Sequence, residues 1–159
     1  MKRTLACLAA LALAGLAGSA HAQSTDPIGD LISKATQPAA GPDMRLKSTL
    51  YHVGAKGVGA LDSLGCRVSP MRTLAVDPTR IPRRTIVFIK ETVGMKMPGG
   101  GVHDGRWYAS DVGGAIKGNR VDLFTGQGKG SMAQFLRKGL SLGTISATKV
   151  GTFKGCPPR

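Results

Sequence analysis

Short segments in which apolar and polar residues alternate, separated by glycine-rich breaks, dominate the chain after residue 43. Alternation with a period of two, in segments rich in β-branched residues, predicts strands, because successive side chains of a strand face opposite sides. The strongest segment is residues 85–90, Thr-Ile-Val-Phe-Ile-Lys. The predicted strands are Leu46–Val53, Thr73–Val76, Thr85–Lys90, Arg106–Ser110, Arg120–Phe124 and Gly143–Val150.

A single helix is predicted between the last two strands. Ser131 is placed to cap it, Met132, Phe135 and Leu136 fall on one face, and Gly139 ends it. Six short strands with one short helix in about 110 residues favour an all-β fold, a small closed barrel whose closure removes the exposed sheet edges.

The N-terminal segment has the pattern of a signal peptide. Lys2 and Arg3 precede an apolar run, Leu5–Leu16, which is too short to span a bilayer comfortably. The small residues Ser19, Ala20 and Ala22 then predict cleavage after Ala22, so residues 1–22 are interpreted as a signal peptide and the protein as exported to the periplasm or cell envelope. Lipidation at Cys7 is the disfavoured alternative, because almost no apolar segment precedes it.

Residues 23–43 are poor in large apolar side chains and rich in Ala, Pro, Ser and Thr. Asp26 and Pro27 could begin a short helix there, so the segment is interpreted as a linker or a loosely docked helix. The folded domain is expected over residues 44–159. The mature chain of 137 residues suits one domain.

Positive charge dominates the composition, with 22 Lys and Arg against 9 Asp and Glu. Removing the signal peptide leaves 20 basic and 9 acidic residues, a net charge of +11. Such a charge attracts polyanions. Export disfavours nucleic acid as the polyanion and favours peptidoglycan glycan strands. A possible second partner is the outer membrane or another envelope protein, contacted peripherally. The protein is expected to be a monomer. The alternative is that the charge serves solubility alone.

Three cysteines are present, and Cys7 is removed with the signal peptide. Cys66 and Cys156 remain as the only pair in an oxidising compartment, which predicts a disulfide. The spacing of a metal-binding CxxC pair is absent from the sequence.

Three aspartates lie at the edges of apolar strands, whereas the others lie in turn-prone sequence. Asp77 follows Leu-Ala-Val, Asp111 follows Trp-Tyr-Ala-Ser, and Asp122 lies within Arg-Val-Asp-Leu-Phe. If the three carboxylates converge, desolvation and mutual repulsion raise the pKa of at least one of them and create a proton donor. The alternative is that each one accepts backbone amide hydrogens at the end of its strand.

Between Asp111 and Asp122 lie two glycines and a lysine. Gly113 and Gly114 permit a positive φ and a close backbone approach, which predicts a tight loop at the site. Lys117 could lower the pKa of one aspartate or bind an anionic group of a substrate. A phosphate-binding loop is disfavoured because the GxxxxGK[ST] spacing is absent.

The segments 74–82 (Leu-Ala-Val-Asp-Pro-Thr-Arg-Ile-Pro) and 111–124 (Asp-Val-Gly-Gly-Ala-Ile-Lys-Gly-Asn-Arg-Val-Asp-Leu-Phe) together resemble the three-aspartate (3D) domain. This family includes the catalytic domain of membrane-bound lytic murein transglycosylase A and small secreted cell-wall hydrolases. The resemblance covers about residues 46–149. It implies a six-stranded double-psi β-barrel, no cofactor, and cleavage of the MurNAc–GlcNAc bond with formation of a 1,6-anhydro end.

The resemblance also implies roles for the aspartates. Asp122 corresponds to the catalytic acid of the family, and Asp111 and Asp77 to its supporting carboxylates. Thr49, on the first predicted strand, is expected to hydrogen-bond within the site. The sequence departs from the family at Val112, where members usually have threonine.

Two other functions remain open at this point. A non-catalytic, expansin-like module would hold glycan in the same groove without cutting it. A metal site built from the three carboxylates is disfavoured, because hard cations need more oxygen ligands than the sequence identifies.

Overall fold

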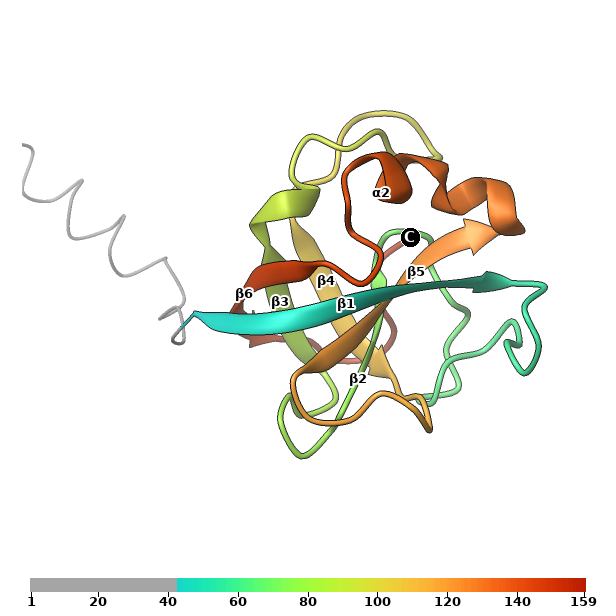
Figure 1. The fold of residues 1–159 in the computed structure, drawn as a ribbon. Helices are drawn as coiled ribbons and strands as arrows, with labels where there is room; N and C mark the ends of the chain where they lie inside the picture. The colour runs from blue at the N-terminus through green and yellow to red at the C-terminus, as the bar shows by residue number, and fades with distance from the viewer. Residues whose placement is uncertain (1–42) are drawn as a thin grey trace, which may run out of the picture. The chain divides into compact units, whose positions relative to one another are not determined.

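Six strands close into a barrel in the computed structural model, which describes residues 43–159 (Figure 1). The predicted signal peptide and residues 23–42 of the predicted linker lie outside the described residues. The strands are β1 (Met44–Val53), β2 (Thr73–Val76), β3 (Thr85–Ile89), β4 (Arg106–Asp111), β5 (Arg120–Gln127) and β6 (Thr144–Thr152). The helical segments are η1 (Lys90–Thr92), η2 (Lys129–Met132) and α2 (Ala133–Arg137). Within residues 43–159, the predictions of six strands, one short α-helix and a closed barrel are confirmed.

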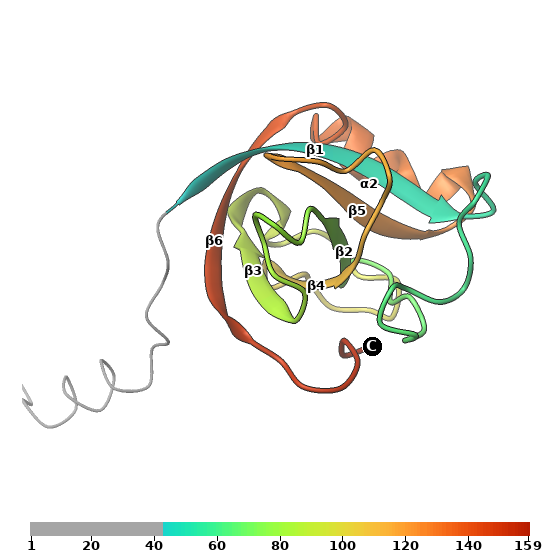
Figure 2. The same ribbon diagram turned by 90° about the horizontal axis from the view of Figure 1, so that it is seen from below.

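The strand order around the barrel is β1-β5-β2-β4-β3-β6. β1 pairs with β5, and β2 with β4, in parallel, while the other neighbours are antiparallel. The view along the barrel shows the strands surrounding a common interior (Figure 2). The double-psi form that the family resemblance implies stays a prediction.

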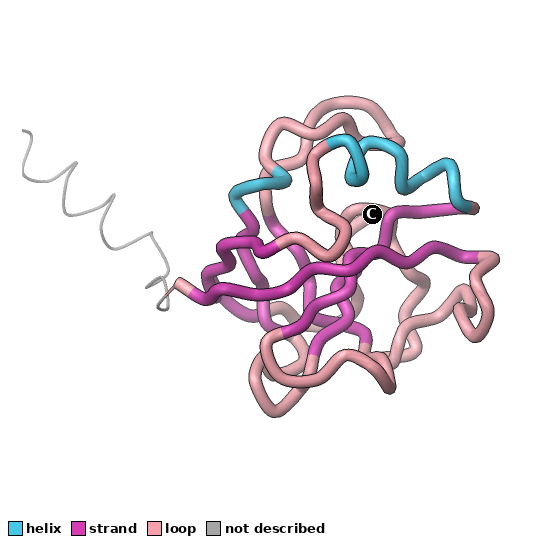
Figure 3. The backbone as a smooth tube through the Cα atoms, viewed as in Figure 1, coloured by secondary structure: helices cyan, strands magenta, loops and turns pink. Residues whose placement is uncertain are grey.

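Large apolar side chains from the strands and from α2 fill the interior. Trp107 of β4 is fully buried and packs edge-on against Phe135 of α2, with ring centroids 6.3 Å apart. The Trp107 ring nitrogen donates a hydrogen bond to the Thr92 hydroxyl at 3.0 Å, so the one polar atom of this indole is satisfied. The helical segments η2 and α2 lie at one end of the barrel (Figure 3).

The predicted helix forms, but two of its details were wrong. Ser131 does not cap α2: it lies in η2, where its hydroxyl donates to the carbonyl of Gly128 at 2.7 Å. Leu136 does not share the buried face of Phe135, since it is 53% exposed. Because the α-helix has only five residues, it buries one large side chain and turns the next outward.

A disulfide joins Cys66, in the long connection between β1 and β2, to Cys156 near the C-terminal end, as the sequence predicted. Ser69 and Arg84 reinforce this attachment, donating hydrogen bonds to the carbonyls of Pro158 at 2.9 Å and Gly155 at 2.6 Å. The segment after β6 is therefore held against the barrel by covalent and polar contacts. Within residues 43–159, no helix is long and apolar enough to cross a membrane.

Candidate functional site

A row of paired residues brings two of the predicted aspartates together. Thr49 of β1 pairs with Asp122 of β5, and Asp122 pairs with Ala75 of β2. Ala75 in turn pairs with Asp111 of β4. Asp122 and Asp111 are therefore separated by one strand, about 10 Å between their backbones, with only a methyl side chain between them.

A pocket of about 210 Å³ opens at this row. Asp111, Ala75 and Asp122 form its floor, and its walls come from the loop after β1 and from the loop after β4. Leu61 and Val112 line it and are 63% and 40% exposed, so apolar side chains edge a pocket that contains two carboxyl groups. Apolar faces beside convergent polar groups are a common arrangement in ligand sites.

Asp122 is the candidate proton donor. Its Oδ1 atom is buried and has no hydrogen-bond partner. Burial is the main cause that raises the pKa of Asp122, and the negative charge of Asp111 adds to it; the Thr49 hydroxyl and the Arg120 guanidinium partly offset the rise. A carboxyl group with a raised pKa keeps its proton to a higher pH, as a general acid requires.

Asp111 lies in a different environment. Its Oδ2 accepts a hydrogen bond from the Tyr51 hydroxyl at 2.9 Å, and its Oδ1 accepts from the backbone N–H groups of Ser63 at 3.1 Å and Val112 at 2.9 Å. Three donors aimed at one carboxyl group suit a carboxylate, which only accepts hydrogen bonds. The two aspartates of the pocket are therefore held in contrasting surroundings, one desolvated and one hydrogen-bonded.

Tyr51 donates to Asp111 and also lies in the electrostatic field of a third carboxyl group, that of Asp62. Burial, the neighbouring Asp111 and, more weakly, Asp122 and Asp62 raise the pKa of Tyr51, so its hydroxyl keeps its proton and stays a donor. Its ring packs against Phe124 at a centroid distance of 5.2 Å, which fixes its direction. Asp62 accepts the N–H groups of Leu64 and Cys66 through Oδ1, while its buried Oδ2 has no partner.

Asp77 does not line the pocket. Its Oδ2 accepts the N–H of Gly118 at 2.7 Å, and its Oδ1 accepts the N–H and the hydroxyl of Thr79 at 3.0 and 2.7 Å. These hydrogen bonds, the one from Gly118 first, lower the pKa of Asp77 from 3.8 to about 2. Asp77 thus fastens the β4–β5 loop to the turn after β2, at the end of the barrel away from α2 (Figure 1).

Of the residues predicted to form the loop between Asp111 and Asp122, one lines the pocket and two lie outside it. Gly113 lines the pocket, whereas Gly114 and Lys117 do not, and Lys117 acts electrostatically on Asp77 as the weakest of the causes that lower its pKa. Neither glycine has the positive φ that the sequence suggested. Gly113 is needed for close approach instead, because a Cβ there would lie 2.7 Å from the Ile116 side chain.

Thr49 also lies at the edge of the site and does not line the pocket. Its hydroxyl donates to the carbonyl of Val121 at 3.2 Å and lies close enough to Asp122 to lower that carboxyl group's pKa. Sequence reasoning missed Tyr51, Ala75 and Ser63. The alternation of the first strand places Tyr51 two residues after Thr49, on the same face, and this signal could have identified it.

Comparison with known proteins supports the resemblance to the 3D domain. Residues 72–135 match the family model named 3D domain. The matched segment contains Asp77, Asp111 and Asp122, so all three aspartates lie within it. Comparison with curated proteins found no match.

Two solved structures are similar to part of this chain. The lytic transglycosylase LtgG of Burkholderia pseudomallei is 28% identical over 65% of this chain and 28% of its own, with a TM-score of 0.42. Escherichia coli MltA with bound chitohexaose is 20% identical over 62% of this chain and 29% of its own, also with a TM-score of 0.42. The chain therefore spans less than a third of the length of these neighbours.

Proposed function

We propose that the protein is a glycosidase of the lytic transglycosylase type that acts on peptidoglycan glycan strands in the cell envelope, with Asp122 as its acid and base. The match to the 3D domain supports the class of substrate. The observation that carries the proposal is the contrast within one pocket: Asp122 is desolvated and has an unpartnered oxygen, while Asp111 beside it accepts three hydrogen bonds. Export after cleavage at Ala22 and the double-psi form of the barrel belong to the same proposal.

The chemistry needs one carboxyl group that changes its protonation state. Protonated Asp122 gives its proton to the glycosidic oxygen as the bond from that oxygen to C1 of the muramyl sugar breaks. The resulting carboxylate then takes the proton of the C6 hydroxyl group, whose oxygen attacks C1. The product is a 1,6-anhydro ring, and Asp122 is protonated again, so no water molecule is consumed.

Asp111 supports this cycle through its negative charge. The charge raises the pKa of Asp122 before the reaction and stabilises the positive charge that develops on the sugar ring in the transition state. Asp77 acts indirectly in this scheme, because its hydrogen bond to Gly118 positions the loop that contributes Gly113 to the pocket. Asp77 is therefore proposed as a positioning residue.

The direct experiment is product analysis. Purified protein is incubated with peptidoglycan between pH 4 and 8, and the released fragments are analysed by mass spectrometry. The proposal expects 1,6-anhydromuropeptides from the wild type and none from Asp122→Asn. Fragments with hydrolysed reducing ends would instead indicate an ordinary glycosidase. Binding of peptidoglycan without release of any fragment would favour the glycan-binding module.

The Asp122→Asn variant also supplies its own folding control. Because the pKa of Asp122 is raised on folding, the ionised carboxylate opposes folding above that pKa. Replacing it with a neutral amide should therefore increase the free energy of unfolding at pH 7, and the gain should shrink as the pH falls and the wild-type carboxyl becomes protonated. A loss of activity without a loss of stability separates a catalytic role from a structural one.

A further inference from the structure

A second hollow, of about 460 Å³, lies next to the aspartate pocket. Val68 lines both hollows, so they meet at this residue. A third hollow, of about 600 Å³, shares Pro70, Met97 and Pro98 with the second. The three hollows, together called the track, therefore border one another at these residues, and the second hollow is the middle one.

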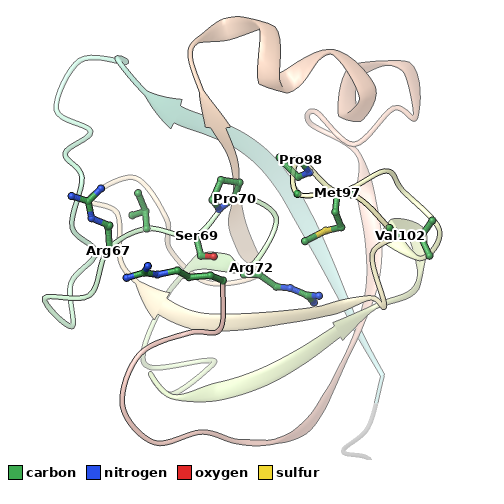
Figure 4. A pocket seen from close by; sticks show the side chains of 12 residues that line it. Arg67, Ser69, Pro70, Arg72, Met97, Pro98 and Val102 are labelled. Carbon is green, nitrogen blue, oxygen red and sulfur yellow. The ribbon is translucent and has the colours of Figure 1, made fainter.

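Three arginines, Arg67, Arg72 and Arg159, line this middle hollow. Figure 4 shows Arg67 and Arg72 on either side of Ser69, with Arg67 on the side away from Val102. Arg72 pairs with Asp104 and also donates to the carbonyl of Arg106 at 3.1 Å, so its charge is already matched.

Arg67 and Arg159 leave positive charge in the hollow. Both are exposed, and among residues 43–159 neither lies within ion-pair distance of a carboxyl group. A guanidinium group presents a planar fork of N–H donors that matches the two oxygens of a carboxylate. The middle hollow therefore offers two unmatched guanidinium groups to an anionic ligand.

The remaining walls are apolar and open. Met97, Pro70 and Pro98 line the hollow, and Val102, which is 66% exposed, lies at its far side (Figure 4). Small apolar side chains could pack against these residues. An apolar wall beside unmatched guanidinium groups fits a short peptide with small side chains and a free carboxylate better than it fits a bare sugar.

The distance along the track is also suitable. Val68 borders the aspartate pocket, and Pro70 lies two residues further on, at most about 7 Å of extended chain. A branch of two or three extended peptide residues covers about 7–10 Å. A peptide attached to a sugar in the aspartate pocket could therefore reach Arg67, the chain neighbour of Val68, and enter the hollow that Arg159 also lines.

We infer that the middle hollow binds a carboxylate of the peptide branch of the glycan, through Arg67 and Arg159, while the sugar occupies the pocket of Asp111 and Asp122. This inference rests on the proposed function, since it takes peptidoglycan as the ligand. It makes the protein selective for glycan that still carries peptides with free carboxylates. Amidated or peptide-free strands would bind more weakly.

Isothermal titration calorimetry with three soluble glycan fragments tests this inference. The fragments are a GlcNAc–MurNAc disaccharide whose peptide has free carboxylates, the same compound with the peptide carboxylates amidated, and the peptide-free disaccharide. The full chain should bind the first about tenfold more tightly than the other two, as expected for two partly exposed charge contacts. In Arg67→Gln/Arg159→Gln the affinity for the first fragment should fall to that for the amidated one.

The matched control removes two positive charges elsewhere. Arg45→Gln/Lys138→Gln changes exposed residues that do not line the track, so it should keep the tenfold preference. An equal loss in both double variants would show general attraction by net charge and would overturn the inference. Peptide-free disaccharide binding as tightly as the free-carboxylate fragment would place the recognised carboxylate on the sugar and would also overturn it.

Failure of this inference can be told apart from failure of the proposed function. If the wild type releases 1,6-anhydro products but binds the free and amidated fragments equally, the carboxylate subsite is refuted and the lytic activity stands. If the wild type prefers the free carboxylates tenfold but releases no such products, the subsite stands and the lytic activity is refuted.

Discussion

The disulfide between Cys66 and Cys156 provides a prediction whose size can be worked out from the structure. The perturbation is the double substitution Cys66→Ala/Cys156→Ala, which removes the cross-link without leaving a free thiol. The two residues are 90 positions apart in the chain, with their Cα atoms 5.5 Å apart. The cross-link therefore closes a loop that spans most of the barrel.

Loop length determines the expected loss of stability. In the chain-entropy treatment, releasing a loop of this length lowers the free energy of unfolding by about 4–5 kcal/mol. Small domains have a total stability of about 5–15 kcal/mol, so the loss is a large fraction of the whole. The hydrogen bonds from Ser69 to Pro158 and from Arg84 to Gly155 remain, and they keep the C-terminal segment near the barrel in the folded state.

The effect should extend to the candidate site. The backbone N–H of Cys66 donates to Asp62 at 2.9 Å, and the same connection contributes Leu61 and Val68 to the walls of the aspartate pocket. Without the cross-link only non-covalent contacts hold these walls. We therefore expect a higher KM for glycan and a smaller change in kcat, because Asp111 and Asp122 lie on strands.

Guanidinium unfolding followed by tryptophan fluorescence measures the stability, since Trp107 is fully buried in the core. Reduced wild type serves as a second form of the same perturbation. A loss below about 1 kcal/mol in both forms would refute the reasoning, because it would mean that the cross-link does not restrict the unfolded chain.

Three further predictions concern the site and the core. Ala75→Leu should fill the space between Asp111 and Asp122 and abolish glycan binding by calorimetry, while circular dichroism checks that the variant stays folded, because Ala75 is 3% exposed and a larger side chain there costs stability. Unchanged binding would show that the ligand does not enter this pocket. Tyr51→Phe keeps the packing against Phe124 but removes the donor to Asp111. Loss of this charge-assisted hydrogen bond should lower the free energy of unfolding by about 1.5–3 kcal/mol, and wild-type stability in guanidinium unfolding would contradict this role. Burial is the main cause that lowers the pKa of His103. Stability should therefore fall as the pH drops below 6.5, where the unfolded chain takes up a proton that the folded protein does not. In His103→Gln this part of the pH dependence of stability should vanish, and an unchanged slope would refute the assignment.

The strands could be predicted because their signals are local. The run Thr-Leu-Ala-Val gives β2 with the bounds that the sequence suggested, and Thr85–Ile89 differs from its prediction by one residue. The helix was less predictable, because packing of Phe135 against Trp107 and not the polarity of Ser131 decides its position. Local pattern determined the elements, and tertiary contacts determined their ends.

The site could be predicted only in part, for a similar reason. The sequence pointed to the three aspartates Asp77, Asp111 and Asp122 as one group. The strand register shows that Ala75 lies between Asp111 and Asp122, and the hydrogen bonds show that Asp77 is used outside the pocket. Neither fact can be read from spacing along the chain. The alternative interpretation, a carboxylate that satisfies backbone amides at a strand end, describes Asp77 and also part of the environment of Asp111.

The most direct measurement is an NMR titration of the side-chain carboxyl carbon of Asp122, in the wild type and in Asp111→Asn. We predict that the wild-type carboxyl group titrates above its ordinary pKa of 3.8, because burial disfavours the charged form and Asp111 repels it. In Asp111→Asn the pKa should fall, because the repulsion is removed while burial remains. A wild-type pKa at or below 3.8, or one that does not respond to Asp111→Asn, would contradict the assignment of Asp122 as a proton donor tuned by its neighbour.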